Sequence, residues 1–249
     1  MKYSIQNHYQ NLAKQYDDFW GCSPDFIQFL TKNIINFLKL SYTDILVDLG
    51  CGTGIYSQAI LSQITLENPV ICVDPADKML AKIPANSHYQ TLVKDAVEFA
   101  YTPGKYDKIL LKEMIHHIED KDKLLQGLFE RLNHEGILLI ILLPPTIEYP
   151  LFEDALSVYE SVQPHYNYLV NICQEIGFQT TVNFVEYSVS ISKEKYFNMV
   201  QNRYMSLLSR FDDDQIKQGL IEMSKKYNNL SNLEFCDRFV FISAQKLNE

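Results

Sequence analysis

The chain has 249 residues, enough for one large domain, and its 47% hydrophobic and 21% charged residues indicate a globular protein with a substantial core. This composition excludes a disordered chain. The formal charge of −9 disfavours nucleic acid as the main partner, because binding to phosphates requires a broad basic surface.

The five cysteines form no CxxC pair, and no histidine cluster stands at metal-binding spacing. We therefore expect reduced, mostly buried thiols and no bound metal. Residues 1–20 are too polar for a signal peptide, and the longest apolar stretch, 136–145, is too short to cross a bilayer. These features predict a cytoplasmic protein without a membrane partner.

The first 145 residues alternate between strand and helix patterns. Ser23 and Pro24 mark a helix start, followed by apolar residues at helical spacing up to 38. Strands are expected at 44–50, 69–75, 88–96, 106–112 and 136–143, with helices at 55–64, 77–83 and 122–132. This alternation predicts a parallel sheet covered by helices on both faces, which binds ligands beyond the carboxyl ends of its strands.

The remainder of the chain has a different pattern. We expect helices at 151–162 and 166–176, strands at 178–191 and 233–246, and one or two helices within 193–227. Gly177 and the pair Asp212 and Gln215 are the expected helix boundary signals.

The predicted fold is α/β, a doubly wound, Rossmann-like, seven-stranded and mostly parallel sheet. A helical cap is expected from the N-terminal segment and from the insert before the last strand. We expect one domain over 1–249, with a core of about 41–192 and 231–249 and a cap of about 1–40 and 193–230.

The stretch VDLGCGTGIYSQ (47–58) carries three alternating glycines directly after the first strand. A phosphate-binding loop would need GxxxxGK[ST], and no lysine follows these glycines. A dinucleotide site would need GxGxxG, but Ile55 stands where the third glycine belongs, which argues against a nicotinamide-dependent oxidoreductase. The pattern present is Asp48, Gly50, Gly52 and Gly54 at every second position.

This acid-and-glycine pattern resembles the first motif of the class I S-adenosylmethionine-dependent methyltransferases. Asp74 agrees with the resemblance, because it ends the second strand 20 residues after Gly54. The resemblance covers about 16–145 and, loosely, the final strand. It implies that Asp74 accepts hydrogen bonds from the ribose hydroxyls and that Asp95 and Ala96 hold the adenine. The full set of implied cofactor-binding residues is Tyr16, Asp48, Gly50, Cys51, Gly52, Gly54, Asp74, Pro75, Met79, Asp95, Ala96 and Lys112.

The chemistry of S-adenosylmethionine suits these residues, since the molecule carries a sulfonium, an amine and a carboxylate but no phosphate. Glycines let the backbone approach its methionine portion, and Asp48 can face the cationic amine directly or through water. Each residue also has a structural alternative. The glycines can simply shape a turn, Asp74 can be a turn acid, and Asp95 can cap a helix.

Candidates for the acceptor side lie past the fourth strand and in the expected cap. His116 or His117 is expected to act as a base or a hydrogen-bond partner, unless the pair only packs a helix start. The expected acceptor-binding residues are Tyr9, Trp20, His117, Tyr149 and Arg203. The aromatic residues can equally belong to the core, and Arg203 can form a surface ion pair instead of clamping an anion.

Two signatures of nucleic-acid methyltransferases are absent. No [DNS]PP[YFW] motif follows the fourth strand, where Lys112 to Ile115 stand, and no Pro-Cys nucleophile occurs. Together with the negative charge, this predicts O- or N-methylation of a small molecule by a monomer or homodimer. The alternative is a catalytically silent protein that binds S-adenosylmethionine as a sensor or partner subunit.

Overall fold

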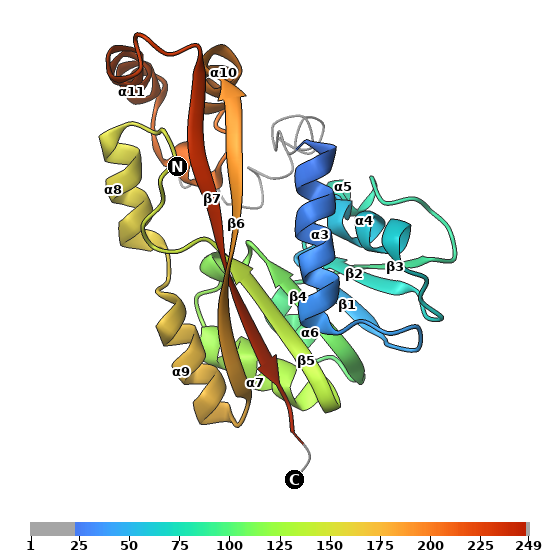
Figure 1. Ribbon diagram of the computed structural model, residues 1–249. Helices are drawn as coiled ribbons and strands as arrows, with labels where there is room; N and C mark the ends of the chain where they lie inside the picture. Colours follow the sequence, from blue (N-terminus) through green and yellow to red (C-terminus); the bar gives the residue numbers. More distant parts are fainter. Residues whose placement is uncertain (1–22, 248–249) are drawn as a thin grey trace. The chain divides into compact units, whose positions relative to one another are not determined.

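The computed structural model describes residues 23–247, and it contains a seven-stranded sheet in the order β3-β2-β1-β4-β5-β7-β6 (Figure 1). The strands are β1 Leu46–Leu49, β2 Val70–Asp74, β3 Tyr89–Val93, β4 Tyr106–Lys112, β5 Leu132–Leu142, β6 Gln179–Ser192 and β7 Asn232–Gln245. The pairs among β1 to β5 are parallel, and β7 pairs antiparallel with β5. The predicted α/β fold is confirmed.

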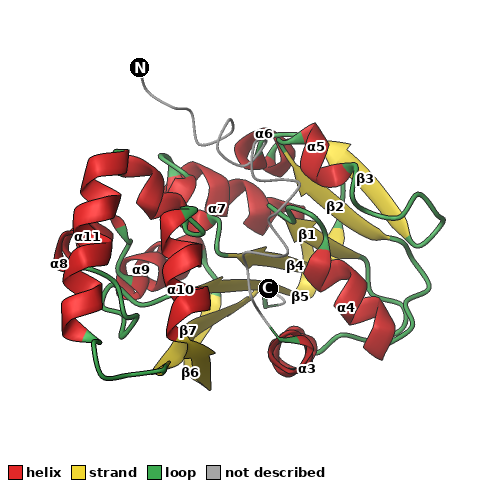
Figure 2. Cartoon of the chain, turned by 90° about the horizontal axis from the view of Figure 1, so that it is seen from above, coloured by secondary structure: helices red, strands yellow, loops and turns green. Residues whose placement is uncertain are grey.

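The strand order reverses between β1 and β4, because the chain first builds β2 and β3 on one side of β1 and then returns to its other side. The helices are α3 Pro24–Leu38, α4 Ile55–Gln63, α5 Asp77–Leu80, α6 Ala96–Ala100, α7 Lys121–Arg131, α8 Glu153–Val162, α9 Tyr166–Ile176, α10 Lys193–Gln201 and α11 Asp213–Lys226, with 3-10 turns η1 Ile115–His117 and η2 Ser206–Arg210. Figure 2 shows α3 and α4 on one face of the sheet and α6 and α7 on the other. The reversal places a ligand site at the carboxyl ends of β1 and β4.

The central strands are buried on both faces, which explains their continuous apolar sequences. Val47 on β1, Leu110 on β4 and Ile140 on β5 are fully buried. Such strands read as unbroken hydrophobic runs because helices cover both sides of a parallel sheet. Residues 136–142 of the apolar run 136–145 form the greater part of β5. Within residues 23–247, no helix combines the length and the apolarity needed to cross a membrane.

The described residues form two compact units. The core unit consists of 23–142, 165–184 and 240–247, and the insert unit consists of 143–164 and 185–239. β6 and β7 each contribute residues to both units. This division differs from the expected one, since α3 groups with the core and residues 143–164 group with the insert. That the chain folds as one domain stays a prediction.

Local signals in the sequence explain where several helices begin and end. The Ser23 hydroxyl accepts a hydrogen bond from the Phe26 N–H at 3.2 Å, and Gly177 ends α9 with a φ of 112°. The helix expected over 77–83 ends at Leu80, and Pro84 accounts for the early end because it disfavours helical backbone in the preceding residue.

Helix α11 begins with a complete capping box. The Asp212 carboxylate accepts a hydrogen bond from the Gln215 N–H at 2.8 Å, and the Gln215 side chain accepts one from the Asp212 N–H at 2.9 Å. We expect Asp212→Ala to lower the free energy of unfolding by about 1 kcal/mol, as measured by urea denaturation. Asp214→Ala, in the same helical turn, is the matched control and should change it by only a few tenths. Equal losses in both variants would contradict the capping role.

Candidate functional site

The glycine loop between β1 and α4 has a backbone that other residues adopt with strain. Gly50, Gly52 and Gly54 have φ values of 76°, 55° and 72°. A Cβ atom on Gly50 would lie 2.8 Å from Met114 Cγ, and one on Gly54 would lie 2.7 Å from Ile83 Cγ1. The nearest atom to a Cβ on Gly52 would be Met79 Cε at 3.8 Å. A Cβ on either flanking glycine would therefore collide with a neighbouring side chain, whereas a Cβ on Gly52 would make an ordinary van der Waals contact with Met79.

Asp74, at the end of β2, is hydrogen-bonded to this loop. Its Oδ2 accepts the Gly52 N–H at 2.9 Å, and its Oδ1 accepts the Ala76 N–H at 2.8 Å. Burial raises the pKa of this carboxyl, and the two N–H donors oppose that rise. The two bonds fix the orientation of the carboxylate and still leave lone pairs on both oxygens for hydroxyl donors.

Asp48 is a buried acid, 3% exposed, near the end of β1. Its Oδ2 accepts a hydrogen bond from the Ser57 hydroxyl at 2.5 Å. Burial raises the pKa of Asp48 to about 6, while the Ser57 bond and the positive charge of Lys112 lower it. The Lys112 ammonium lies 4.6 Å from the centre of the Tyr56 ring. A cation placed beside Asp48 would therefore stabilise its charged form.

Cys51 holds the loop through its backbone. The N–H groups of Gly50 and Cys51 both donate to the Val73 carbonyl, at 2.8 and 3.1 Å, which ties the loop to β2. A hydrogen bond to the Cys72 thiol, together with burial, raises the pKa of the Cys51 thiol well above its usual range. Since the thiolate is the reactive form, this cysteine is unreactive.

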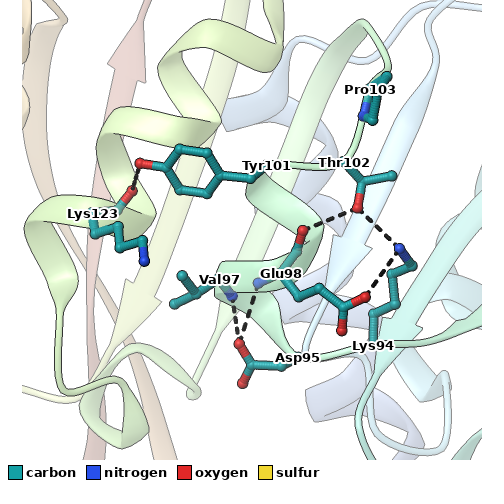
Figure 3. Close-up of a pocket in the computed structure, with 8 residues that line it drawn as sticks. All are labelled: Lys94, Asp95, Val97, Glu98, Tyr101, Thr102, Pro103 and Lys123. Carbon is teal, nitrogen blue, oxygen red and sulfur yellow. Dashed lines mark hydrogen bonds and ion pairs between the residues drawn. The ribbon is translucent and has the colours of Figure 1, made fainter.

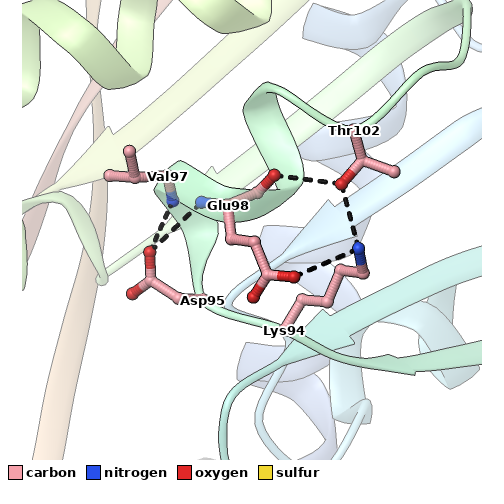
Figure 4. Close-up of polar contacts among 5 residues, drawn as sticks. All are labelled: Lys94, Asp95, Val97, Glu98 and Thr102. Carbon is pink, nitrogen blue, oxygen red and sulfur yellow. Dashed lines mark hydrogen bonds and ion pairs between the residues drawn. The ribbon is translucent and has the colours of Figure 1, made fainter.

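Asp95 caps α6, which is one of the two roles that the sequence predicts for it. Its Oδ1 accepts the N–H groups of Val97 and Glu98 at 2.8 and 3.3 Å (Figure 4). Ala96 is buried behind it. The capping bonds involve one carboxylate oxygen, so they do not prevent the other from meeting a ligand.

An open groove of about 680 Å³ lies next to Asp95 (Figure 3). It is lined by Lys94, Asp95, Val97, Glu98, Tyr101, Thr102, Pro103 and Lys123. The Lys94 ammonium is bound within the groove wall, 3.0 Å from the Thr102 hydroxyl and 3.3 Å from the Glu98 carboxylate. Within the groove, Lys94 is therefore paired with Glu98, and Asp95 is bound to the first turn of α6.

His116 and His117 lie together in η1, just after β4, with ring centroids 4.0 Å apart. Burial lowers the pKa of His116 to about 3, and the neighbouring His117 and Lys121 add to this effect. The His116 Nδ1 is buried and has no hydrogen-bond partner within residues 23–247. A histidine with so low a pKa is a weak proton acceptor at neutral pH, so His116 is unsuited to act as a general base.

Among the other expected acceptor-binding residues, Tyr149 and Arg203 belong to the insert unit, and Tyr9 and Trp20 lie outside the described residues. Tyr16, which is expected to bind the cofactor, also lies outside them. The Arg203 guanidinium lies 2.7 Å from an Asp213 carboxylate oxygen and donates to the Phe211 carbonyl at 3.1 Å. These contacts favour the ion-pair interpretation of Arg203 over the anion clamp.

Several residues of the site were not expected from the sequence. Ser57 binds Asp48, and its only signal was a small hydroxyl residue in the first turn of α4. Met114 and Ile83 close around the glycines from distant loops, and no local pattern indicated this. Within the described part of the chain, no group of three or more His, Cys, Asp or Glu residues is arranged to hold a metal.

Known proteins share this fold and this loop. A family model for the methyltransferase domain matches residues 47–140. Demethylmenaquinone methyltransferase of Lactobacillus johnsonii is 23% identical over 201 residues, which cover 76% of this chain and 75% of that protein. The chain spans 51% and 47% of the length of two further relatives, also named as methyltransferases.

Two solved structures support the same fold. A protein of Anabaena variabilis, assigned to methyl transfer in an antibiotic biosynthesis pathway, is 17% identical, with a TM-score of 0.67 over 85% of this chain and 95% of that one. Phosphoethanolamine N-methyltransferase 2 of Haemonchus contortus, in complex with phosphomonomethylethanolamine and S-adenosylhomocysteine, is 18% identical, with a TM-score of 0.61 over 100% of this chain and 58% of that one. The fold is Rossmann-like, and residues 47–140 match the methyltransferase domain. The chain is similar to S-adenosylmethionine-dependent methyltransferases.

The contrast between two glycines can be tested by substitution. Gly52→Ala should cost about 1–2 kcal/mol of stability, from its positive φ alone, and should weaken S-adenosylhomocysteine binding at least tenfold. Gly50→Ala should destabilise the protein more, because its Cβ also collides with Met114. Urea denaturation and isothermal titration measure the two effects. A folded Gly52→Ala protein with unchanged affinity would refute the close approach of a ligand.

The two shifted pKa values predict opposite contributions to stability between pH 7 and pH 5. The pKa of His116 is lowered on folding. The free energy of unfolding is therefore unaffected by this group above about pH 6.5 and decreases as the pH falls from there towards 3. The pKa of Asp48 is raised on folding, so its contribution increases as the pH falls through about 6. In Asp48→Asn, only the fall in the free energy of unfolding that is due to His116 remains. We expect its free energy of unfolding to fall about 1 kcal/mol more than that of the wild type over this range, as measured by urea denaturation. Parallel pH profiles would contradict this.

Proposed function

We propose that this methyltransferase transfers the methyl group to an oxygen or nitrogen atom of a small molecule. The observation that carries the proposal is the glycine loop, in which the Gly52 N–H donates a hydrogen bond to the carboxylate of Asp74. The negative net charge supports a small acceptor over nucleic acid. The names given for two similar proteins include demethylmenaquinone and phosphomonomethylethanolamine, and neither of these molecules is a nucleic acid.

The residues at the loop fit S-adenosylmethionine on three observations. Gly52 presents no side chain to its methionine portion, the carboxylate of Asp74 can accept the ribose hydroxyls, and its cationic amine would stabilise the charged form of the buried Asp48. When bound, the cofactor supplies a methyl group activated by a sulfonium. Asp95 and Ala96 would hold the adenine, and the remaining proposed contacts are Tyr16, Gly50, Cys51, Gly54, Pro75, Met79 and Lys112.

The protein's own contribution is to align the acceptor and to exclude water, because the methyl group is already activated. We assign proton removal from the acceptor, where it is needed, to His117. His116 would remain neutral beside it and offer its buried Nδ1 as a hydrogen-bonding group. Tyr9, Trp20, Tyr149 and Arg203 are kept as proposed acceptor contacts, with Arg203 the weakest because it is already paired.

The setting of the enzyme is part of the proposal. We place it in the cytoplasm as a monomer or homodimer that acts without nucleic acid or membrane partners. Size-exclusion chromatography with light scattering determines the oligomeric state.

Asp74→Asn tests the cofactor site. The amide keeps the size of the side chain but cannot accept hydrogen bonds on both sides, so S-adenosylhomocysteine should bind 10- to 100-fold more weakly by isothermal titration. Asp77→Asn, an exposed acid in the first turn of α5, is the matched control and should bind normally. Undiminished binding to folded Asp74→Asn would remove the assignment of the ribose contact.

Methyl transfer itself is tested with S-adenosylmethionine that carries a labelled methyl group, offered with panels of phenols, amines and carboxylates. Label should pass to one of these classes in the wild type and not in Asp74→Asn. Cofactor binding without transfer to any class would favour the silent sensor instead.

A further inference from the structure

A network of hydrogen bonds leads from the glycine loop to the buried acid of β1, entirely within the core unit. The Cys51 thiol is bonded to the Cys72 thiol, which donates in turn to the Ser57 hydroxyl at 3.4 Å. The Ser57 hydroxyl donates to Asp48 Oδ2 at 2.5 Å. We call these four residues the Asp48 network. An ionised carboxylate can only accept hydrogen bonds, so the network ends on Asp48.

The inner members of the network are shut off from water. Ser57 and Cys72 are fully buried, and Asp48 is nearly so. A carboxylate buried without a hydrogen-bond donor is costly, and Ser57 is the donor that the described residues provide for this one. Ser57 lies in the first turn of α4, which begins directly after Gly54. Since water has little access, it cannot easily replace the hydroxyl if that group is removed.

Charged groups on the neighbouring strands also act on Asp48. Burial raises the pKa of Asp48 to about 6, and the hydrogen bond from Ser57 opposes that rise more strongly than the positive charge of Lys112 does. The negative charge of Asp74 adds to the rise. The pKa of the Cys51 thiol lies well above its usual range, so this thiol stays protonated and adds no charge. Ser57 is thus the strongest influence that keeps the buried acid ionised.

We propose that Ser57 is a positioning residue for the cofactor, whose hydroxyl, supported by the Cys72 thiol, holds the Asp48 carboxylate as the counter-charge of the cofactor's amine. This inference rests on the proposed contact between Asp48 and the amine. It deepens that contact, because it states what keeps a buried acid ready for a cation. It also makes cofactor affinity depend on pH, since a protonated Asp48 offers no charge to the amine.

The test is the pH dependence of S-adenosylhomocysteine affinity, measured on the full chain by isothermal titration. In the wild type, the affinity should fall as the pH falls through about 6, because Asp48 takes up a proton there. Ser57→Ala removes the hydroxyl, so the midpoint of this fall should move upward by about one pH unit. The variant should then bind about fivefold more weakly than the wild type at about pH 6, and within about twofold of it at about pH 8.

Two comparisons show whether the shift acts through Asp48. Ser62→Ala removes an exposed hydroxyl from the same helix, where it donates to the Ala59 carbonyl at 2.7 Å, and it should leave the midpoint unchanged. In an Asp48→Asn protein, adding Ser57→Ala should no longer move the pH profile, because the carboxylate is gone. A loss of affinity by the same factor at every pH would show that Ser57 is merely structural, and it would overturn the proposal.

The profiles of the wild type and of Asp48→Asn separate this inference from the proposed function. If S-adenosylhomocysteine does not bind, or if it binds and the two profiles coincide, the contact between Asp48 and the amine fails and the inference fails with it. If the two profiles differ while Ser57→Ala leaves the midpoint in place, the positioning role of Ser57 fails alone.

A second variant keeps the test decisive if Ser57→Ala does not fold. Ser57→Cys, studied under reducing conditions, replaces the hydroxyl by a thiol of similar shape that is a weaker hydrogen-bond donor. The midpoint should again move upward. A folded Ser57→Cys protein with an unchanged midpoint would overturn the proposal.

Discussion

One hydrogen bond, from the Gly52 N–H to the Asp74 carboxylate, joins the loop after β1 to the end of β2. It requires a glycine turn with positive φ on one side and an acid at the last position of a strand on the other. Because β1 and β2 are neighbouring parallel strands, both groups emerge at the same edge of the sheet. The packing of Met114 and Ile83 against the flanking glycines then holds the loop in place.

Burial gives this edge of the sheet its electrostatic character. The pKa of Asp48, about 6, lies only about one unit below neutral pH, and the hydrogen bond from Ser57 and the charge of Lys112 keep it from rising further. His116, also buried, is held neutral beside His117. An acid that gains from a nearby cation and a histidine that avoids its own charge are suited to a cationic cofactor and a neutral nucleophile.

The insert unit follows a different principle, since several of its charged groups bind partners within the unit. Arg203, Lys193 and Arg238 all bind partners within the unit, and Asp212 caps α11. Asp237 differs because it shares a strand face with aromatic residues and is bound by a tyrosine.

The sequence by itself determined the sheet, because strand periodicity, apolar runs and glycine turns are local patterns. The predicted strand at 106–112 coincides with β4, and the capping box at Asp212 forms as expected. It also singled out Gly52 and Asp74, which the structure joins by a hydrogen bond. Only the tertiary structure decided that Met114 packs on Gly50, that His116 is neutral and that Arg203 is paired, and it brought Tyr149 to Asp237, 88 positions further along the chain. Burial and contacts between distant segments depend on the packing of the whole unit, which no local pattern records.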